Sequence, residues 1–484
     1  MRKRFDLQMK IGQTPISEIY INPKSKNSLD QLVASLKEIY CNEEYNEKIF
    51  NAIERYMPKV DSRNGRPGMN LWTIFVLAQV RMCLGESYDM LHNLANNHRL
   101  LRKLIGIVDE YGVESIRFEY QNIYDNVSKL SDAMLVEIND VIIDFGHREV
   151  FKKKGDTALH LKTDSFVLES NVHFPTDYNL LWDCARKSLD TVGIFLKKYP
   201  QVSGWRKLKN WRSELKSLMR SVGRVSHVGG KNKEEKLKSV TFLYLEKCRL
   251  LLSKLTFGKE HLPLNDEIDL ANHCILEEYI GLMIKHIDLV ERRIIKGESI
   301  AHGEKMMSIF ETYTEWVAKG KFRPSVELGK KISITSDQFG LILFHKIMNN
   351  EQDRDIVIEL ADKIKNKYKL IDSISLDKGH WNKENKELLE LEIPLVVLPK
   401  LGRRTAEEKE FEESKMFKHF KNKHSAIESN INELGQRGLD RCPDRGYFHF
   451  CNYVAMGICA YNLKKIGKKI LENQIKEFAN RIAA

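Results

Sequence analysis

Apolar residues recur at helical spacing through the first third of the chain. In 29–40 and 44–56 they fall three or four positions apart, and 71–84 is apolar almost throughout. Gly85 then marks the end of one helix and Ser87 the cap of the next. The pattern predicts an all-helical N-terminal region, in which the helices on either side of Gly85 fit a helix-turn-helix and, equally well, a plain helical hairpin.

The period changes twice further along. From Thr157 to Leu168 apolar and polar residues alternate, which is typical of a strand. Segment 178–325 returns to helical spacing without a strand pattern. The remaining pattern predicts strands at 331–336 and 341–348 joined by a hairpin turn, a helix at 355–368, a strand at 370–376, a helix at 382–391, a strand at 393–398 and, opened by a capping box at Thr405, a long helix toward Leu434. Such alternation predicts an α/β layer with parallel strand pairs.

Two acidic residues occupy special positions in this layout. Asp164 lies near the end of the first predicted strand, and Asp377 ends a later one, with a turn at Lys378-Gly379. Ligands of α/β sheets gather at the carboxyl ends of strands. We therefore expect Asp377 to point into a site.

A third acid, Glu428, lies on the predicted long helix. Ile427, Ile431 and Leu434 follow the spacing of a buried helical face. Glu428 is the residue after Ile427, so we expect it at the edge of that face, within reach of the sheet.

Clustered carboxylates are costly to bury unless cations neutralise them, and hard oxygen ligands suit Mg²⁺ or Mn²⁺. Two such ions, roughly 3.5–4 Å apart, activate a water or a 3′-hydroxyl and stabilise the leaving oxygen of a phosphodiester. The alternative interpretation makes each acid a cap, a turn residue or a surface charge. We interpret Asp337 as a turn residue, Asp353 and Asp355 as a helix cap with its neighbouring acid, and Glu169 as pointing to the other face of its strand.

Charge is unevenly distributed. The 78 Lys and Arg exceed the 67 Asp and Glu by 11, and Lys197–Lys238 alone holds thirteen Lys and Arg against three Glu. This favours a polyanionic partner, with a solvated helical face as the alternative. Within this stretch we interpret Gly223–Lys231 as a flexible basic loop. No run of about 18 uncharged apolar residues and no signal sequence occur, so we expect a cytoplasmic protein without a membrane partner.

From about Thr157 to Ile466 the sequence resembles bacterial insertion-sequence transposases of the DDE class, in particular the ISNCY-type group. Three segments carry the resemblance, in the group's order: Asp164–Asp177 followed by Leu180–Asp183, Asp377–Gly379 with Glu384 and Asn385 downstream, and His424–Leu434 followed by Gly438–Gly446. The chain departs from related transposases at His380, where these often have Tyr or Phe.

The resemblance implies a ribonuclease H-like α/β core, a mixed sheet with flanking helices, in which Asp164, Asp377 and Glu428 are catalytic and bind Mg²⁺, with Mn²⁺ as a substitute. It implies a helical DNA-binding domain at 1–155, a catalytic domain at 156–177 and 326–470, a basic helical insertion at 178–325, and a helix end or tail at 471–484. The implied activity is binding of terminal inverted repeats, cleavage at the element ends and joining to target DNA, by a homo-oligomer assembled on double-stranded DNA and, in the cell, at the nucleoid.

Two alternatives remain open: a DNA-binding protein derived from a transposase that is catalytically silent, and a metal-dependent endonuclease without strand transfer. Candidate DNA contacts are the basic residues near the predicted site, in the insertion and in the N-terminal turn: Arg63, Arg66, Arg206, Lys207, Lys209, Arg212, Arg224, Lys378, Lys421 and His424. For His424, packing or capping is the alternative to a phosphate contact.

Overall fold

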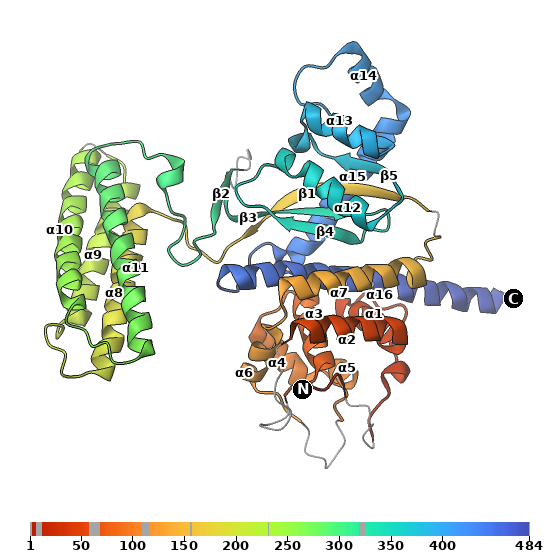
Figure 1. Cartoon of the computed structure of the whole chain (residues 1–484), viewed down its shortest axis with the longest axis horizontal. Helices are drawn as coiled ribbons and strands as arrows, with labels where there is room; N and C mark the ends of the chain where they lie inside the picture. Colours follow the sequence, from red (N-terminus) through yellow and green to blue (C-terminus); the bar gives the residue numbers. More distant parts are fainter. Residues whose placement is uncertain are drawn as a thin grey trace. The chain divides into compact units, whose positions relative to one another are not determined.

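The chain forms two compact units in a computed structural model (Figure 1). The structure describes residues 2–5, 12–57, 68–108, 116–154, 157–230, 232–318 and 325–483. The first unit combines 1–171 with 317–484, and the second is 172–316. The predicted N-terminal domain (1–155) and the predicted catalytic segment 326–470 fall in the first unit, whereas the predicted catalytic segment 156–177 is divided, with 172–177 in the second unit.

The N-terminal part of the first unit is helical, as predicted. Most of its helices begin at an Asn, Ser or His whose side chain accepts a hydrogen bond from a backbone N–H of the first turn. The elements are η1 (Ile16–Glu18), α1 (Ser28–Cys41), α2 (Glu43–Tyr56), α3 (Leu71–Leu84), α4 (Tyr88–Asn97), α5 (Arg99–Leu104), α6 (Tyr120–Val127), α7 (Asp132–Phe145) and η2 (Gly146–Val150).

The turn between α3 and α4 has the predicted chemistry. Gly85 ends α3 in the left-handed region at φ 68°, and the Ser87 side chain accepts from the N–H of Met90 at the start of α4. Yet α3 is buried on nearly all sides. Its side chains therefore form core rather than a surface that could enter a DNA groove.

The last helix, α16 (Tyr447–Ala483), ties the two ends of the chain together by packing on α1, α3 and α7. It meets α1 so closely that a Cβ at Gly467 would lie 1.6 Å from the carbonyl oxygen of Gln31. The predicted end at 471–484 is thus, up to residue 483, the last part of one helix. Within the described residues, neither α16 nor another helix is long and apolar enough to cross a membrane.

The first unit also holds a six-stranded mixed sheet with flanking helices, which confirms the predicted α/β class at this level. The sheet runs β2-β3-β1-β5-β6, and β4 also pairs with β3. The central strand β1 is antiparallel to β3 and parallel to β5, which is parallel to β6. The strands are β1 (Leu159–Glu169), β2 (Glu315–Ala318), β3 (Val326–Ser336), β4 (Ile342–Ile347), β5 (Ile371–Leu376) and β6 (Leu395–Val397).

The hairpin between β3 and β4 forms as predicted, and Asp337 is its turn residue. The Asp337 carboxylate accepts from the N–H groups of Phe339 and Leu341, both at 2.9 Å, and from His147 Nε2 at 2.6 Å. This carboxylate is fully buried, and these partners satisfy it. Asp337 therefore fastens η2 to the sheet.

Helices and short turns follow the strands in the predicted order: η5 (Asp353–Asp355), α12 (Val357–Lys367), η6 (Lys378–His380), α13 (Lys383–Glu392), α14 (Ala406–Glu413) and α15 (Lys415–Leu434). The capping box at Thr405 is present. The single long helix expected after it is wrong, because Ser414 is extended and its side chain caps α15.

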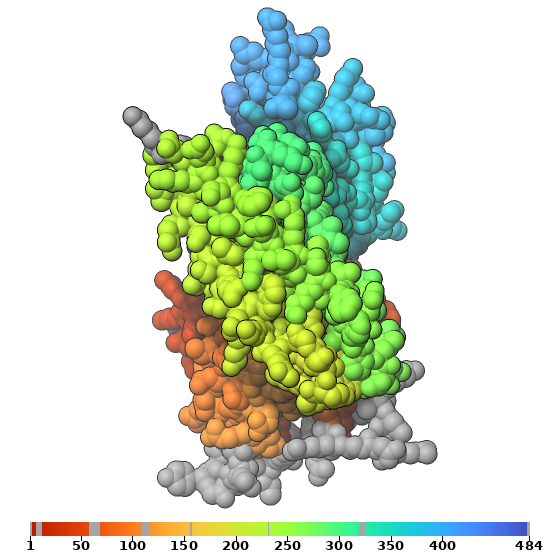
Figure 2. All heavy atoms as spheres, turned by 90° about the vertical axis from the view of Figure 1, so that its left-hand side faces the viewer, coloured from red at the N-terminus to blue at the C-terminus, as the bar shows by residue number. Residues whose placement is uncertain are grey.

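The second unit is a bundle of four helices around a core of its own: α8 (Asp177–Lys198), α9 (Leu208–His227), α10 (Lys233–Lys259) and α11 (Glu267–Val290). These are the yellow to green helices of Figure 1, and Figure 2 shows the bundle's surface from the side of α10. The rings of Phe174 and Trp316, at the two ends of this unit, lie 5.8 Å apart.

Two predictions within 178–325 are wrong. Residues Glu315–Ala318 form strand β2 where only helices were expected, because they pair with the edge of β3. Gly223–His227 is the last part of α9 rather than a loop, since Val222 and its neighbours on α9 pack on the bundle core. The connection between α9 and α10 begins only at Val228, and Lys231 lies outside the described residues.

Candidate functional site

Two of the predicted metal ligands lie side by side on neighbouring strands. Thr163 of β1 pairs with Leu376 of β5 in parallel register, so the next residues, Asp164 and Asp377, are neighbours across the strands. Asp164 is not near the end of its strand as expected, because β1 continues to Glu169 alongside β3. Asp377 immediately follows β5, as predicted.

Asp377 is held by two donors from the turn that follows it. The Gly379 N–H donates to Asp377 Oδ1 at 3.0 Å, and His380 Nδ1 donates to the same oxygen at 2.5 Å. Burial raises the pKa of Asp377, but the hydrogen bond and charge of His380 and the N–H of Gly379 outweigh it, and the pKa is lowered. Asp377 is therefore an oriented carboxylate, with its side chain 47% exposed.

Asp164 is in a different environment. Burial raises the pKa of Asp164 to about 6; the Ser165 N–H and His380 lower it, and the charges of Asp377 and Asp353 raise it. The Ser165 N–H bond to Asp164 Oδ1 measures 2.7 Å. No Lys or Arg of the described chain forms an ion pair with Asp164. A partly buried acid beside a second acid, without a cationic side chain to neutralise it, favours binding of a cation.

Helix α15 crosses the face of the sheet to which Asp164 belongs. The ring of Phe420 lies 5.4 Å from that of His160, and His424 Nδ1 is 3.0 Å from Ser375 Oγ. From His160 to Lys162, the partner of Ser375 in the sheet, the strand advances about 6.6 Å, and from Phe420 to His424 the helix advances about 6 Å. Helix and strands therefore keep pace from one contact to the next. The next step on α15 is Glu428, which falls level with Asp164 and Asp377.

Glu428 itself is exposed, and its helical neighbours only partly follow the prediction. Ile427 and Leu434 are buried, whereas Ile431 is only partly buried, and Asn430 takes its place by accepting a hydrogen bond from Tyr461 at 2.8 Å. Among the described residues, no three His, Cys, Asp or Glu side chains converge closely enough to hold a metal ion. The structure thus brings Asp164 and Asp377 together and leaves Glu428 on the adjoining helix without convergence.

Two buried imidazoles belong to this region: His380 contacts Asp377, and His424 contacts Ser375. Burial lowers the pKa of His424, although the charges of Asp377 and Glu428 raise it, so His424 lies within electrostatic reach of both acids. The Nε2 atoms of His380 and His424 are buried and have no hydrogen-bond partner within the described part of the chain. Asp164 and Asp377 supply the hard oxygen ligands that a divalent cation prefers, but these acids and imidazoles do not converge as a set of three within the described residues.

Asp353 is an acid of this region that the sequence interpretation missed. It was expected to cap a helix, but Gln352 and Asp355 form the capping box, whereas Asp353 Oδ1 accepts from Ser165 Oγ at 2.7 Å and its Oδ2 from Lys331 Nζ at 3.1 Å. A Cβ at Gly379 would lie 3.2 Å from Asp377 Oδ1 and 3.4 Å from Asp353 Oδ2.

One motif residue offers a reason for this placement. Asn385, from the downstream part of the second motif, donates to the Arg354 carbonyl at 2.6 Å and so fixes the turn that carries Asp353.

The candidate DNA contacts are scattered over the chain. Lys378, next to Asp377 in the sequence, and Lys421, on α15, are exposed, while His424 is packed against the sheet through Ser375. Arg206, Lys207, Lys209, Arg212 and Arg224 are exposed on or beside α9 in the second unit. Arg63 and Arg66 lie outside the described residues.

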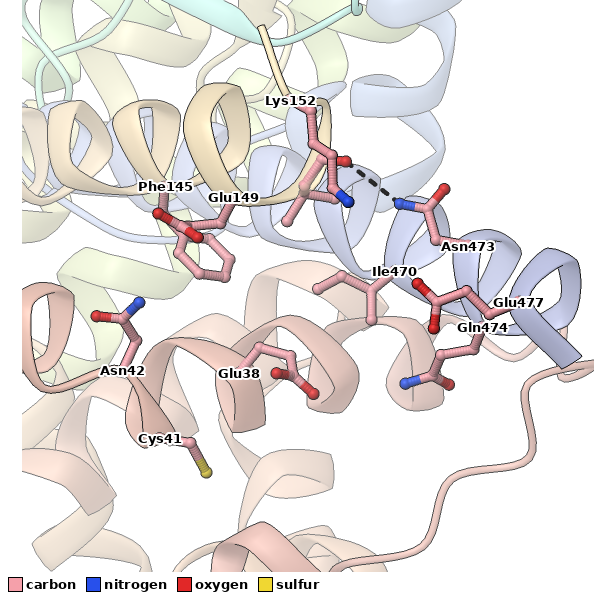
Figure 3. A pocket seen from close by; sticks show the side chains of 11 residues that line it. Glu38, Cys41, Asn42, Phe145, Glu149, Lys152, Ile470, Asn473, Gln474 and Glu477 are labelled. Atoms are coloured by element: carbon pink, nitrogen blue, oxygen red, sulfur yellow. Dashed lines mark hydrogen bonds between the residues drawn. The ribbon is translucent and has the colours of Figure 1, made fainter. Parts of the chain in front are cut away.

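A surface hollow of about 450 Å³ lies elsewhere in the first unit, between α1, η2 and α16 (Figure 3). Glu38, Glu149 and Glu477 line it together with Lys152. None of its lining residues is among the acids discussed above. We place the candidate site at Asp164 and Asp377, because these two acids are distant in the sequence and neighbours across two strands.

No family model matches this chain, and neither a curated protein nor a solved structure is similar to it at the level required for a match.

Proposed function

We propose that this chain is a transposase of the DDE class, with a ribonuclease H-like catalytic core. It binds the terminal inverted repeats of its insertion sequence, cleaves DNA at the element ends and joins them to target DNA. The observation that carries the proposal is the adjacency of Asp164 and Asp377, which are 213 residues apart in the sequence and neighbours in the sheet.

Two neighbouring carboxylates, with no cationic side chain paired to Asp164 in the described chain, support a phosphodiester chemistry that uses metal ions. Asp164, Asp377 and Glu428 would hold Mg²⁺, or Mn²⁺ in its place. When bound, these ions supply activation of the attacking water or 3′-hydroxyl and stabilisation of the leaving oxygen. His380 orients Asp377 through a 2.5 Å hydrogen bond, and the exposed Glu428 leaves the site open to a bulky substrate. The mixed sheet with helices on its faces supports the fold proposal.

The DNA partner is supported by charge. The chain carries a net charge of +11, exposed Lys378 follows Asp377 in the sequence, and exposed Lys421 lies on α15, the helix that carries Glu428. Basic side chains beside a metal site hold the phosphates on either side of the scissile bond. Assembly as a homo-oligomer on the paired ends is part of the proposal.

The test is cleavage of a duplex carrying the element ends, with Mg²⁺, Mn²⁺ or EDTA. We expect metal-dependent cutting by the parent and a loss of at least about 100-fold in Asp377→Asn, since one ligand of the metal is removed. The matched control is Asp362→Asn, which changes an exposed acid of α12 that forms no ion pair within the described chain.

The outcomes separate the three candidate functions. End binding without cutting by the parent would favour a catalytically silent DNA-binding protein. Cutting without joining of a pre-cleaved 3′-hydroxyl end would favour an endonuclease. Cutting that survives Asp377→Asn would mean that the acids are wrongly assigned.

A further inference from the structure

Helix α9 of the bundle carries a row of cations on one side. Lys209, Arg212, Lys216, Arg220 and Arg224 follow one another at intervals of three or four residues, and all five are exposed. A spacing of 3.6 residues per turn keeps them within one face. From Lys209 to Arg224 the row extends about 22 Å, at 1.5 Å per residue. We call these five residues the α9 ridge.

The bundle core fixes the direction of this ridge. Leu215 and Val222 are buried on the other side of α9, and Leu218 packs beside them. The tryptophans of this basic stretch also pack in the bundle: Trp205 is buried and Trp211 packs against the core. These rings are therefore not available to stack on bases.

The charges of the ridge are largely uncompensated. Asp190 of α8 pairs with Arg212, and Glu214, on another side of α9, pairs with Lys247 at 2.5 Å. Lys209, Lys216, Arg220 and Arg224 form no ion pair within the described chain. Like charges four residues apart destabilise a helix, so this arrangement opposes folding of α9. Such a row is explained by a polyanion that neutralises it.

We propose that the α9 ridge binds the sugar-phosphate backbone of duplex DNA without reading its sequence. Ser213 and Ser217, exposed beside the cations, are further phosphate donors. An anionic membrane surface fits less well, because that side of α9 exposes serines where an apolar wedge would be needed. The choice of DNA over RNA rests on the proposed function. The binding of phosphates by the ridge rests on its own charges and does not depend on that function.

The test uses the full chain, in EDTA, and measures its affinity for a random-sequence duplex over a series of NaCl concentrations. The variant K216Q/R220Q/R224Q removes three ridge cations. Each lost phosphate contact lowers the slope of log Kd against log salt by about 0.9, so we expect a decrease of about 2.7 and a loss of affinity on the order of 100-fold at 0.15 M salt. The element ends should lose as much affinity as the random duplex.

The matched control, K236Q/K285Q/K296Q, removes three exposed cations of the same unit outside α9. An unchanged slope in the ridge variant, or an equal decrease in the control, would overturn the proposal. Loss of binding to duplex RNA with retained DNA binding would overturn the choice of partner. Because binding is read in EDTA, a ridge effect in a protein that never cleaves DNA would leave this proposal standing while the proposed catalytic function fails.

Discussion

Arg81 of α3 and Asp444, 363 residues later, form a two-bond ion pair: Nη1 to Oδ2 at 2.9 Å and Nη2 to Oδ1 at 2.7 Å. Arg81 is 2% exposed and lies between two rings, with its guanidinium carbon 3.9 Å from the ring centre of Tyr88 and 5.3 Å from that of Tyr453. Asp444 belongs to the third motif of the sequence. Its place in the structure is thus to hold the N-terminal helices to the segment before α16.

This relationship predicts a large loss of stability. Asp444→Ala leaves a buried guanidinium without its anion, and we expect the free energy of unfolding to fall by about 3 kcal/mol. Urea denaturation followed by circular dichroism measures it. Arg445→Ala, at the exposed neighbouring position, should change stability by less than about 0.5 kcal/mol. Equal effects of the two substitutions would show that the Arg81–Asp444 ion pair does not contribute to the free energy of unfolding beyond what an exposed side chain does.

Asp164 predicts a conflict between stability and function. Because its folded pKa, about 6, is above the ordinary value, its contribution to stability is present below about pH 4 and is lost as pH rises through 6. Asp164→Asn should therefore be more stable than the parent at pH 8 in EDTA, by about 1–3 kcal/mol. At pH 4 the difference should nearly vanish. Thermal unfolding at both pH values measures it, and a parent that is the more stable protein at pH 8 would contradict it.

His380 predicts a positioning effect on the proposed reaction. Without the 2.5 Å hydrogen bond, the Asp377 carboxylate loses its orientation and the interaction that lowers its pKa. His380→Ala should lower the apparent affinity for Mg²⁺ in DNA cleavage by about 10- to 100-fold, and should move the acid limb of the pH profile upward. His380→Asn, which can still donate a hydrogen bond, should recover part of both. A parental pH profile in His380→Ala would exclude the positioning role.

His286 predicts acid sensitivity of the bundle. It is fully buried on α11, neither ring nitrogen has a partner within the described chain, and burial lowers its pKa to about 4. The contribution of neutral His286 to the free energy of unfolding is therefore fully present above pH 6.5 and is lost as pH falls toward 4, by at most about 3 kcal/mol. His286→Leu should remove this loss in denaturant unfolding at pH 7 and pH 4.5. The exposed His302→Gln is the control, and identical pH dependence of all three proteins would refute the assignment.

Local chemistry made much of the fold predictable. The hairpin turn, the cap at Ser87 and the strand that ends before Asp377 each depend on neighbouring residues alone. The parallel pairing that makes Asp164 and Asp377 neighbours was expected from the alternation of strands and helices. These acids were chosen because the three motif segments resemble those of DDE transposases. The hydrophobic pattern by itself would not have distinguished them from other acids.

Long-range contacts decided the rest. Asp353 looks like a helix cap because an acid before a helix commonly is one, and only the packing of Ser165 and Lys331 takes its carboxylate elsewhere. The glycine-containing end of α9 looks like a loop because its stabilisation comes from the bundle core rather than from helix propensity. Likewise, β2 is too short to be recognised without its partner strand.

The contact of Phe174 with Trp316 has a consequence for how the chain folds. During synthesis, β1 emerges more than 150 residues before the main part of β3, its antiparallel neighbour, and a loop of that length is slow to close. Once the bundle has folded around its own core, its two ends are side by side, and the insertion behaves as a short connection. We therefore expect the bundle to fold first and to hasten pairing of the strand that carries Asp164, so that a substitution weakening the bundle core would slow assembly of a sheet whose own contacts are unchanged.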